Sequence, residues 1–197
     1  SETLQPEALT AVDIAEGMLA ACAKRGLPNM SYVCADAEEL PHFSQGFDLV
    51  FSNFALQWCP SIETAFTNIK RSLTAAGQFA FSIPAADTLV ELKQAWAQVD
   101  SSVHVNEFYS EPEIHSALRS AAFENVNLQV VEKVLFYPSP LELMRELKSL
   151  GAHNVHAGRN IGLTGKQHFK QMLQAYEGFR REQGVPATWR VLVGLAG

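Results

Sequence analysis

Short apolar runs and longer amphipathic stretches alternate along the first half of the chain. The clearest apolar run, residues 47–51, lies between Gly46 and the polar pair Ser52 and Asn53. Such runs, bounded by turn residues, are typical of strands buried on both faces of a parallel sheet. We therefore predict an interior strand here, whose carboxyl end lies at the edge where open α/β sheets bind their ligands.

The same periodicities predict the other elements. Strands are expected at residues 8–13, 30–34, 78–83, 125–137 and 187–196, and helices at 15–25, 61–73, 88–99, 110–121, 139–151 and 164–180. Strands that alternate with helices through short connections indicate parallel βαβ units. The predicted fold is therefore α/β: a Rossmann-like, doubly wound, mostly parallel sheet with helices on both faces and a small helical lobe.

Length and composition fit a single domain. The chain has 197 residues, of which 47% are hydrophobic and 18% charged, enough to bury one sizeable core. We predict one domain over residues 1–197, with the ligand-binding half at 1–84 and a substrate lobe with closing strands at 85–197. A capping box at Thr88 and Glu91 is expected to open the first helix of that lobe.

No apolar run approaches the roughly 18 residues of a membrane span, and the amino end lacks a signal sequence. We therefore expect a cytoplasmic protein without a membrane partner. The cysteines Cys22, Cys34 and Cys59 are odd in number and form no Cys-x-x-Cys pair, so we interpret them as reduced core residues.

Charge is distributed unevenly within the net charge of −6. Residues 1–124 contain 6 Lys and Arg against 16 Asp and Glu, whereas residues 125–197 contain 9 against 5. The acidic part is a poor binder of nucleic acid. The basic part fits an acidic partner or an anionic substrate, and ordinary solvated helix faces explain it equally well.

Acidic or polar residues end three of the predicted strands. Asp13, Asp36 and Asn53 stand at these ends, and parallel pairing would place them along one sheet edge, about 4.8 Å apart for neighbouring strands. A carboxylate at Asp13 would accept hydrogen bonds from both ribose hydroxyls of a nucleoside. Ile14 would cover an adenine face, Asp36 would accept a bond from its amine, and the Ala37 N–H would reach a ring nitrogen.

For each acid alone, a helix N-cap or a loop carboxylate is an equally good interpretation. The set of strand ends favours a nucleotide-like ligand. His153 and His156 are three residues apart, but no third ligand stands near them in the sequence, so no metal site is predicted.

Three segments together resemble the class I S-adenosylmethionine-dependent methyltransferases. Residues 12–19 are similar to the second-strand segment of that family, residues 34–41 to its adenine-contacting segment, and residues 47–53 to its fourth-strand motif. The resemblance implies a Rossmann-like fold and S-adenosylmethionine as cofactor. The glycine-rich loop that this family carries after its first strand does not precede Asp13. We therefore expect the chain to be a fragment that lacks the N-terminal part of a longer protein, with a degenerate relative as the alternative.

A narrower resemblance extends over nearly the whole chain. The Asn-x-x-x-Gln-Trp motif of residues 53–58, the Leu-Lys-x-x-Gly-Ala motif of residues 147–152 and the pair Gly158 and Arg159 resemble malonyl-acyl-carrier-protein O-methyltransferases. The resemblance implies methylation of the free carboxylate of a malonyl thioester, on acyl carrier protein or coenzyme A, early in biotin synthesis. It also implies an acidic carrier protein as partner, with basic docking candidates at Lys166, Lys170, Arg180 and Arg181.

The implied reaction needs no general base, because a carboxylate is already ionised at neutral pH. Lys148, with Arg159 behind it, would steer the substrate carboxylate, and Gln57 and Trp58 would shape the pocket beside the methyl group. Asn53 would hold the amino-acid end of the cofactor. A solvated Lys148 at a helix C-terminus and a core Trp58 are the alternatives.

Two other functions fit the same sequence. One is a methyltransferase of this fold that acts on another small acid or a quinone. The other is a non-catalytic, methyltransferase-like protein that serves as an assembly or binding partner.

Overall fold

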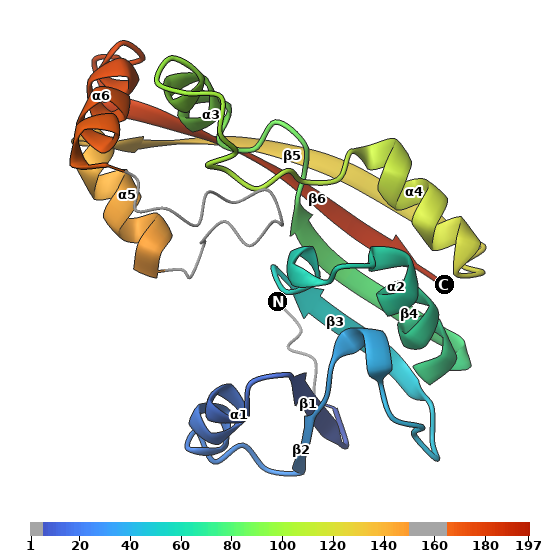
Figure 1. The fold of residues 1–197 in the computed structure, drawn as a ribbon. Helices are drawn as coiled ribbons and strands as arrows, with labels where there is room; N and C mark the ends of the chain where they lie inside the picture. The colour runs from blue at the N-terminus through green and yellow to red at the C-terminus, as the bar shows by residue number, and fades with distance from the viewer. Residues whose placement is uncertain (1–5, 150–164) are drawn as a thin grey trace. The chain divides into compact units, whose positions relative to one another are not determined.

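The computed structural model describes residues 6–149 and 165–197 (Figure 1). The chain divides into two compact units. The first comprises Ser1–Ala80, Ser116–Val126 and Leu195–Gly197, and the second comprises Phe81–His115 and Asn127–Gly194. No helix in the described ranges is long and apolar enough to cross a lipid bilayer.

The described strands form two sheets. β1 (Leu9–Asp13) and β2 (Met30–Cys34) pair in parallel, in a register that sets Asp13 opposite Cys34. The larger sheet has the order β3-β4-β6-β5. Its strands are β3 (Phe47–Asn53), β4 (Leu73–Pro84), β5 (Val126–Tyr137) and β6 (Val185–Ala196). In Figure 1 the arrows of β3 and β4 point the same way, and β6 runs opposite to its neighbours β4 and β5.

The predicted helices are present, with ends that differ from the predicted ones by a few residues. They are α1 (Glu16–Ala23), α2 (Ile62–Ser72), α3 (Val90–Ala97), α4 (Glu111–Ser120), α5 (Pro140–Ser149) and α6 (Lys166–Glu177), with two short 3₁₀ turns, η1 (Ala37–Glu39) and η2 (Leu56–Trp58). Their alternation with the strands confirms the α/β class.

The start of β4 differs from the prediction. From the sequence, Ala76 and Gly77 end the preceding helix and the strand covers only 78–83, but in the structure the strand begins at Leu73, directly after α2. A Cβ atom at Gly77 would lie 2.6 Å from the carbonyl oxygen of Phe47 on the neighbouring segment. Gly77 therefore permits close approach of two backbones within the sheet, rather than ending a helix.

The capping box predicted at Thr88 is wrong. The Thr88 hydroxyl donates to the carbonyl of Arg190, and the Glu91 carboxylate accepts from the backbone and hydroxyl of Thr188. Both side chains satisfy partners on β6 instead of the helix end, and Leu89 precedes α3 in the left-handed region with φ of 57°. Tertiary pairing has replaced the local cap.

Aromatic packing forms the core of the first unit. Phe66 on α2 meets Phe79 on β4 edge to face at 5.6 Å between ring centroids, and Phe79 lies 5.9 Å from Phe123. Lys70, one turn after Phe66, places its ammonium 4.9 Å from the centroid of the Phe123 ring. These rings exclude water from the side of β4 that faces α2, and the cation adds attraction to the ring face.

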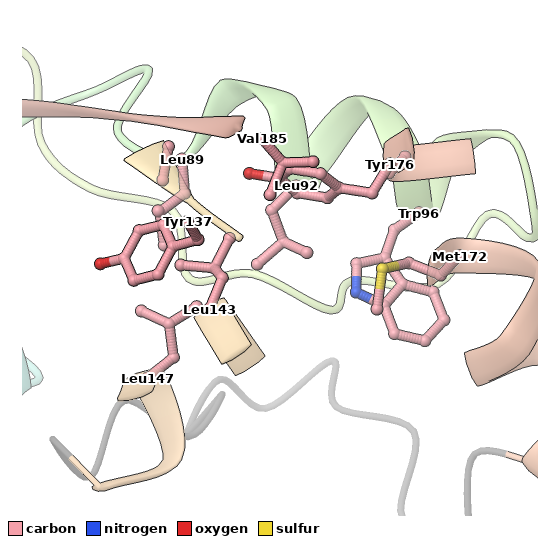
Figure 2. Close-up of a cluster of buried hydrophobic side chains, with 11 residues drawn as sticks. Leu89, Leu92, Trp96, Tyr137, Leu143, Leu147, Met172, Tyr176 and Val185 are labelled. Atoms are coloured by element: carbon pink, nitrogen blue, oxygen red, sulfur yellow. The ribbon is translucent and has the colours of Figure 1, made fainter. Parts of the chain in front are cut away.

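The second unit has its own core, in which α3 and α5 both pack against α6. Figure 2 shows the side chains of this cluster pointing toward one another. Its buried members are Leu89, Leu92, Ala95, Trp96, Tyr137, Leu143, Leu147, Met172, Tyr176, Val185 and Ala187. The hydroxyl of Tyr176, a fully buried member, donates to the carbonyl of Pro186 at 2.8 Å, so burying this polar group costs little.

Burial of β3 on both faces, which its apolar sequence suggested, is wrong for the described residues. Leu49 is 42% exposed and Phe51 is 72% exposed. Both residues lie on one face of β3, which is an edge strand of the four-stranded sheet among the described residues. The cysteines are free as predicted, but Cys34 is exposed rather than part of a core.

Candidate functional site

Asp13 occupies the last position of β1. Its carbonyl accepts from the Ala35 N–H at 3.2 Å, which continues the ladder with β2, and its Oδ1 accepts from the Ala15 N–H at 2.8 Å. The side chain thus closes the turn that leads into α1. Its second oxygen, Oδ2, has no hydrogen-bond partner within residues 6–149 and 165–197.

Asp36 follows β2 at the same edge of the small sheet, two residues after Cys34, which pairs with Asp13. Its Oδ1 accepts from the Glu38 N–H at 2.9 Å and caps η1. Its Oδ2 likewise has no partner in the described part of the chain. The structure therefore brings these two carboxylates to one edge, as predicted, and each keeps one oxygen for another donor.

Apolar and donor groups lie next to the two acids. Ile14, directly after Asp13, is 69% exposed. The backbone N–H of Ala37, directly after Asp36, has no acceptor among the described residues. Ile14 thus offers an exposed apolar surface, as its predicted contact with an adenine face requires. The Ala37 N–H offers a donor, as its predicted bond to a ring nitrogen requires.

The turn that carries Asp36 is held by α2. Glu38 Oε1 accepts from the Ser61 N–H at 2.8 Å, and Asn68 Nδ2 donates to the Glu38 carbonyl at 2.7 Å. These bonds join groups 23 and 30 residues apart, so Glu38 fixes the loop to the helix that follows β3. The sequence analysis missed this role of Glu38, because no local sequence pattern indicates that it bonds with Ser61 and Asn68.

Cys59, between η2 and α2, is influenced by the negative charges of Glu38 and Asp36. Burial, together with the negative charges of Glu38 and Asp36, raises the pKa of its thiol to about 11. The thiol is therefore protonated at neutral pH and unsuited to nucleophilic chemistry. The bond from the Ser61 N–H to Glu38 Oε1 places the segment after β3 beside the Asp36 loop.

Asn53 ends β3 and is exposed. It belongs to the four-stranded sheet, whereas Asp13 and Asp36 follow strands of the small sheet. The link between them runs through α2, which contacts both η1 and η2. That all three side chains share one rim stays a prediction.

Gln57 and Trp58 lie in η2, which Leu56 anchors with only 4% of its surface exposed. Gln57 Nε2 donates to the carbonyl of Phe54 at 2.7 Å, so its amide is directed to its own turn. Trp58 is 38% exposed, which argues against the alternative that it is a core residue.

The remaining substrate candidates are Lys148 and Arg159. Lys148 is exposed in the last turn of α5, in the second unit, where a cation is favourable beside the helix C-terminus. Arg159 lies outside the described residues. Within the described ranges no three His, Cys, Asp or Glu side chains gather as metal ligands do.

Comparison with known proteins identifies the family. The family model described as methyltransferase domain matches residues 2–81. A malonyl-[acyl-carrier protein] O-methyltransferase from Laribacter hongkongensis is 37% identical over 202 residues, an alignment that covers 97% of this chain and 68% of the relative. The chain belongs to the malonyl-[acyl-carrier protein] O-methyltransferase family.

The chain is also similar to longer, bifunctional proteins. The biotin biosynthesis bifunctional protein BioHC from Saccharophagus degradans is 42% identical over 190 residues, which cover 91% of this chain and 34% of that protein. The chain thus spans about a third of the bifunctional relative and about two thirds of the Laribacter relative.

A solved structure confirms the fold. The YcgJ protein of Bacillus subtilis superposes with a TM-score of 0.64 at 15% identity, over 96% of this chain and 82% of that one. At this identity the likeness concerns the fold alone, and with the matching methyltransferase domain it establishes the predicted Rossmann-like α/β architecture of the methyltransferase family.

Proposed function

We propose that this protein methylates the free carboxylate of a malonyl thioester carried by acyl carrier protein, with S-adenosylmethionine as methyl donor. This reaction is an early step of biotin synthesis, which we assign to the cytoplasm. Residues 1–84 would form the cofactor half, and residues 85–197 the substrate lobe. Relatives named for this reaction, at 37% to 40% identity over most of the chain, support the proposal.

One structural observation carries the cofactor assignment. Asp13 and Asp36 stand at the same edge of the β1–β2 pair, each with one oxygen used by its own loop and one left without a partner in the described part of the chain. An adenosine group offers what these residues lack, since ribose hydroxyls and the adenine amine are donors. Exposed Ile14 and the free Ala37 N–H complete a set that fits the cofactor.

In this assignment Asp13 accepts from the ribose hydroxyls, and Asp36 accepts from the adenine amine. Ile14 covers one face of the adenine ring, the Ala37 N–H donates to a ring nitrogen, and Asn53 holds the amino-acid end. When bound, S-adenosylmethionine supplies a methyl group on a positively charged sulfur.

The other requirement is to position the substrate. Its carboxylate is ionised at neutral pH, so no residue has to remove a proton. Lys148 and Arg159 would attract the carboxylate, and Trp58 would exclude water from its surroundings. Exclusion of water favours a reaction in which opposite charges are neutralised, and correct orientation contributes much of the rate enhancement.

The surface charge is consistent with an acidic carrier protein or with coenzyme A as carrier. Basic side chains in the second unit include Lys166, Lys170, Arg180 and Arg181. Arg180 already pairs with Glu177 through its Nε, at 2.6 Å, so it is the least available of the four. Docking by such charges would weaken as salt concentration rises.

The test is a calorimetric titration of the complete purified protein with S-adenosylhomocysteine, the demethylated cofactor. We expect Asp13→Asn to weaken binding by about tenfold, because it loses a charge-assisted hydrogen bond. The matched control is Asp48→Asn, an exposed acid on β3 whose Oδ1 accepts from Thr74, and this variant should bind like the unmodified protein. No heat at millimolar ligand would reject the enzyme and favour a non-catalytic binding protein.

The acceptor is tested separately. Methyl transfer to malonyl-carrier protein, malonyl-coenzyme A, free small acids and quinones is compared by mass spectrometry. A product mass increased by one methyl group on the malonyl thioesters alone supports the proposal. Transfer to a free acid or a quinone instead would favour a related methyltransferase of the same fold.

A further inference from the structure

The turn that leaves β3 holds an unusual backbone conformation. Phe54, the first residue after the strand, has φ of 52°. A bulky side chain in this left-handed region is a backbone outlier, which persists only where neighbouring groups hold it. The residue before it is Asn53, so the conformation of Phe54 sets the direction in which the chain leaves a proposed ligand-binding position.

Gln57 is the group that closes this turn. Its Nε2 donates to the Phe54 carbonyl at 2.7 Å, and the Trp58 N–H donates to the Ala55 carbonyl at 3.2 Å. Leu56, the first residue of η2, is buried, so its side chain anchors this turn to the core. The side-chain bond of Gln57 therefore ties the outlier residue to a turn that is itself anchored in the core.

The oxygen of the Gln57 side-chain amide is in an unfavourable environment. Gln57 Oε1 is fully buried and has no hydrogen-bond partner within the described ranges. A buried acceptor without a partner is unfavourable, so the side chain is retained here despite its oxygen. Its Nε2 is already engaged, which disfavours the role of pocket-shaping side chain beside the methyl group that the sequence suggested.

We propose that Gln57 is a positioning residue, whose bond to the Phe54 carbonyl fixes the left-handed turn and thereby places Asn53 for the cofactor. The ligand part of this inference rests on the proposed function. The turn itself does not, and it can be measured without any ligand.

The first experiment is amide hydrogen exchange on the protein without ligand. Gln57→Met keeps the length of the side chain and removes the donor, and exchange at residues 54–58 is expected to accelerate about tenfold while α2 stays protected. Gln98→Ala is the matched control, since the Gln98 side chain also donates to a backbone carbonyl, at 3.4 Å on an exposed helix end. Unchanged exchange at residues 54–58 in Gln57→Met would overturn the inference.

The second experiment separates positioning from general stability. Gln57→Met should raise the Kd for S-adenosylhomocysteine, and the KM for the methyl donor, by about tenfold, with little change in kcat. The same substitution made in a Phe54→Gly protein should change both constants less than threefold, because glycine adopts the left-handed region without help. An equal loss in both backgrounds would show a merely structural role and overturn the inference.

The two proposals fail in different ways. Absence of cofactor binding by the unmodified protein overturns the proposed function, whereas normal binding that Gln57→Met leaves intact overturns only the role of Gln57.

Discussion

At the scale of single residues, one of the two interpretations that the sequence left open for Asp13 and Asp36 is observed, and ligand binding by these residues stays a prediction. Asp13 and Asp36 serve as loop and cap carboxylates through Oδ1, and each retains Oδ2. A short local turn uses one carboxylate oxygen, so capping and ligand binding do not exclude each other. Sequence pattern finds such positions because strand ends are local features.

The thiol of Cys59 gives a test of the surroundings of Asp36. With its pKa near 11, the thiolate at pH 8 is about a hundredfold scarcer than for an unperturbed thiol. In a protein whose other two cysteines are replaced by serine, we expect slow labelling of Cys59 by a maleimide. Glu38→Gln should speed this labelling severalfold, because it removes a nearby negative charge and keeps the acceptor for Ser61.

The neighbouring exposed acid supplies the control. Glu39→Gln alters the same net charge, and it should leave the labelling rate nearly unchanged. Equal acceleration in both variants would contradict the proximity of Cys59 to the Glu38 carboxylate.

At the scale of elements, periodicity located the helices and strands, and it failed where a distant partner decides the outcome. β4 begins at Leu73 because its first residues find a partner in β3, although Gly77 suggested a break. Thr88 and Glu91 form their bonds with β6, about a hundred residues away. Such pairings have no local signature in the sequence.

Two glycines should respond in opposite ways to alanine. Gly184 has φ of 126°, and a Cβ there would lie 2.4 Å from the Tyr137 carbonyl oxygen. Gly184→Ala should therefore lower the free energy of unfolding by at least about 2 kcal/mol. Gly17→Ala, in α1 with no atom within 4 Å of the new Cβ, should raise it by about 0.5–1 kcal/mol. Denaturant unfolding measures both, and a neutral Gly184→Ala would contradict the backbone contact.

The loop after α3 should make stability depend on pH. Asp100 Oδ1 accepts from the Ser102 N–H at 2.8 Å and bonds with His104 Nε2 at 2.7 Å, while His104 stacks on Trp96 at 3.7 Å. His168 on α6 approaches Asp100 Oδ2 at 3.6 Å. Burial alone would raise the pKa of Asp100, but the bonds from Ser102 and His104 lower it.

A lowered pKa means that Asp100 stabilises the folded state above the ordinary carboxyl pKa, and that this contribution disappears as pH falls through the folded value. The effect should be under about 1 kcal/mol, because the carboxylate keeps contact with solvent. Between about pH 5 and pH 3, Asp100→Asn should therefore lose less unfolding free energy than the unmodified protein. Identical pH profiles would contradict the proposed pairing, and Asp48→Asn serves as the exposed reference.

At the scale of the whole molecule, the class and the methyltransferase fold followed from the sequence, while burial did not. Leu49 and Phe51 belong to an apolar run that predicted a covered strand, yet both are exposed on the edge strand β3. An apolar run specifies what a strand prefers to contact, and the neighbours actually present decide its burial. Strand pairing likewise could not be predicted for Asn53, which belongs to the four-stranded sheet, whereas Asp13 and Asp36 follow strands of the two-stranded sheet.

The most direct test of the account is a crystal structure of the protein with S-adenosylhomocysteine. We predict the ribose hydroxyls within hydrogen-bond distance of Asp13 Oδ2 and the adenine amine beside Asp36, with Asn53 at the amino-acid end of the ligand. A ligand bound elsewhere, with neither carboxylate in contact with its adenosine group, would contradict the account.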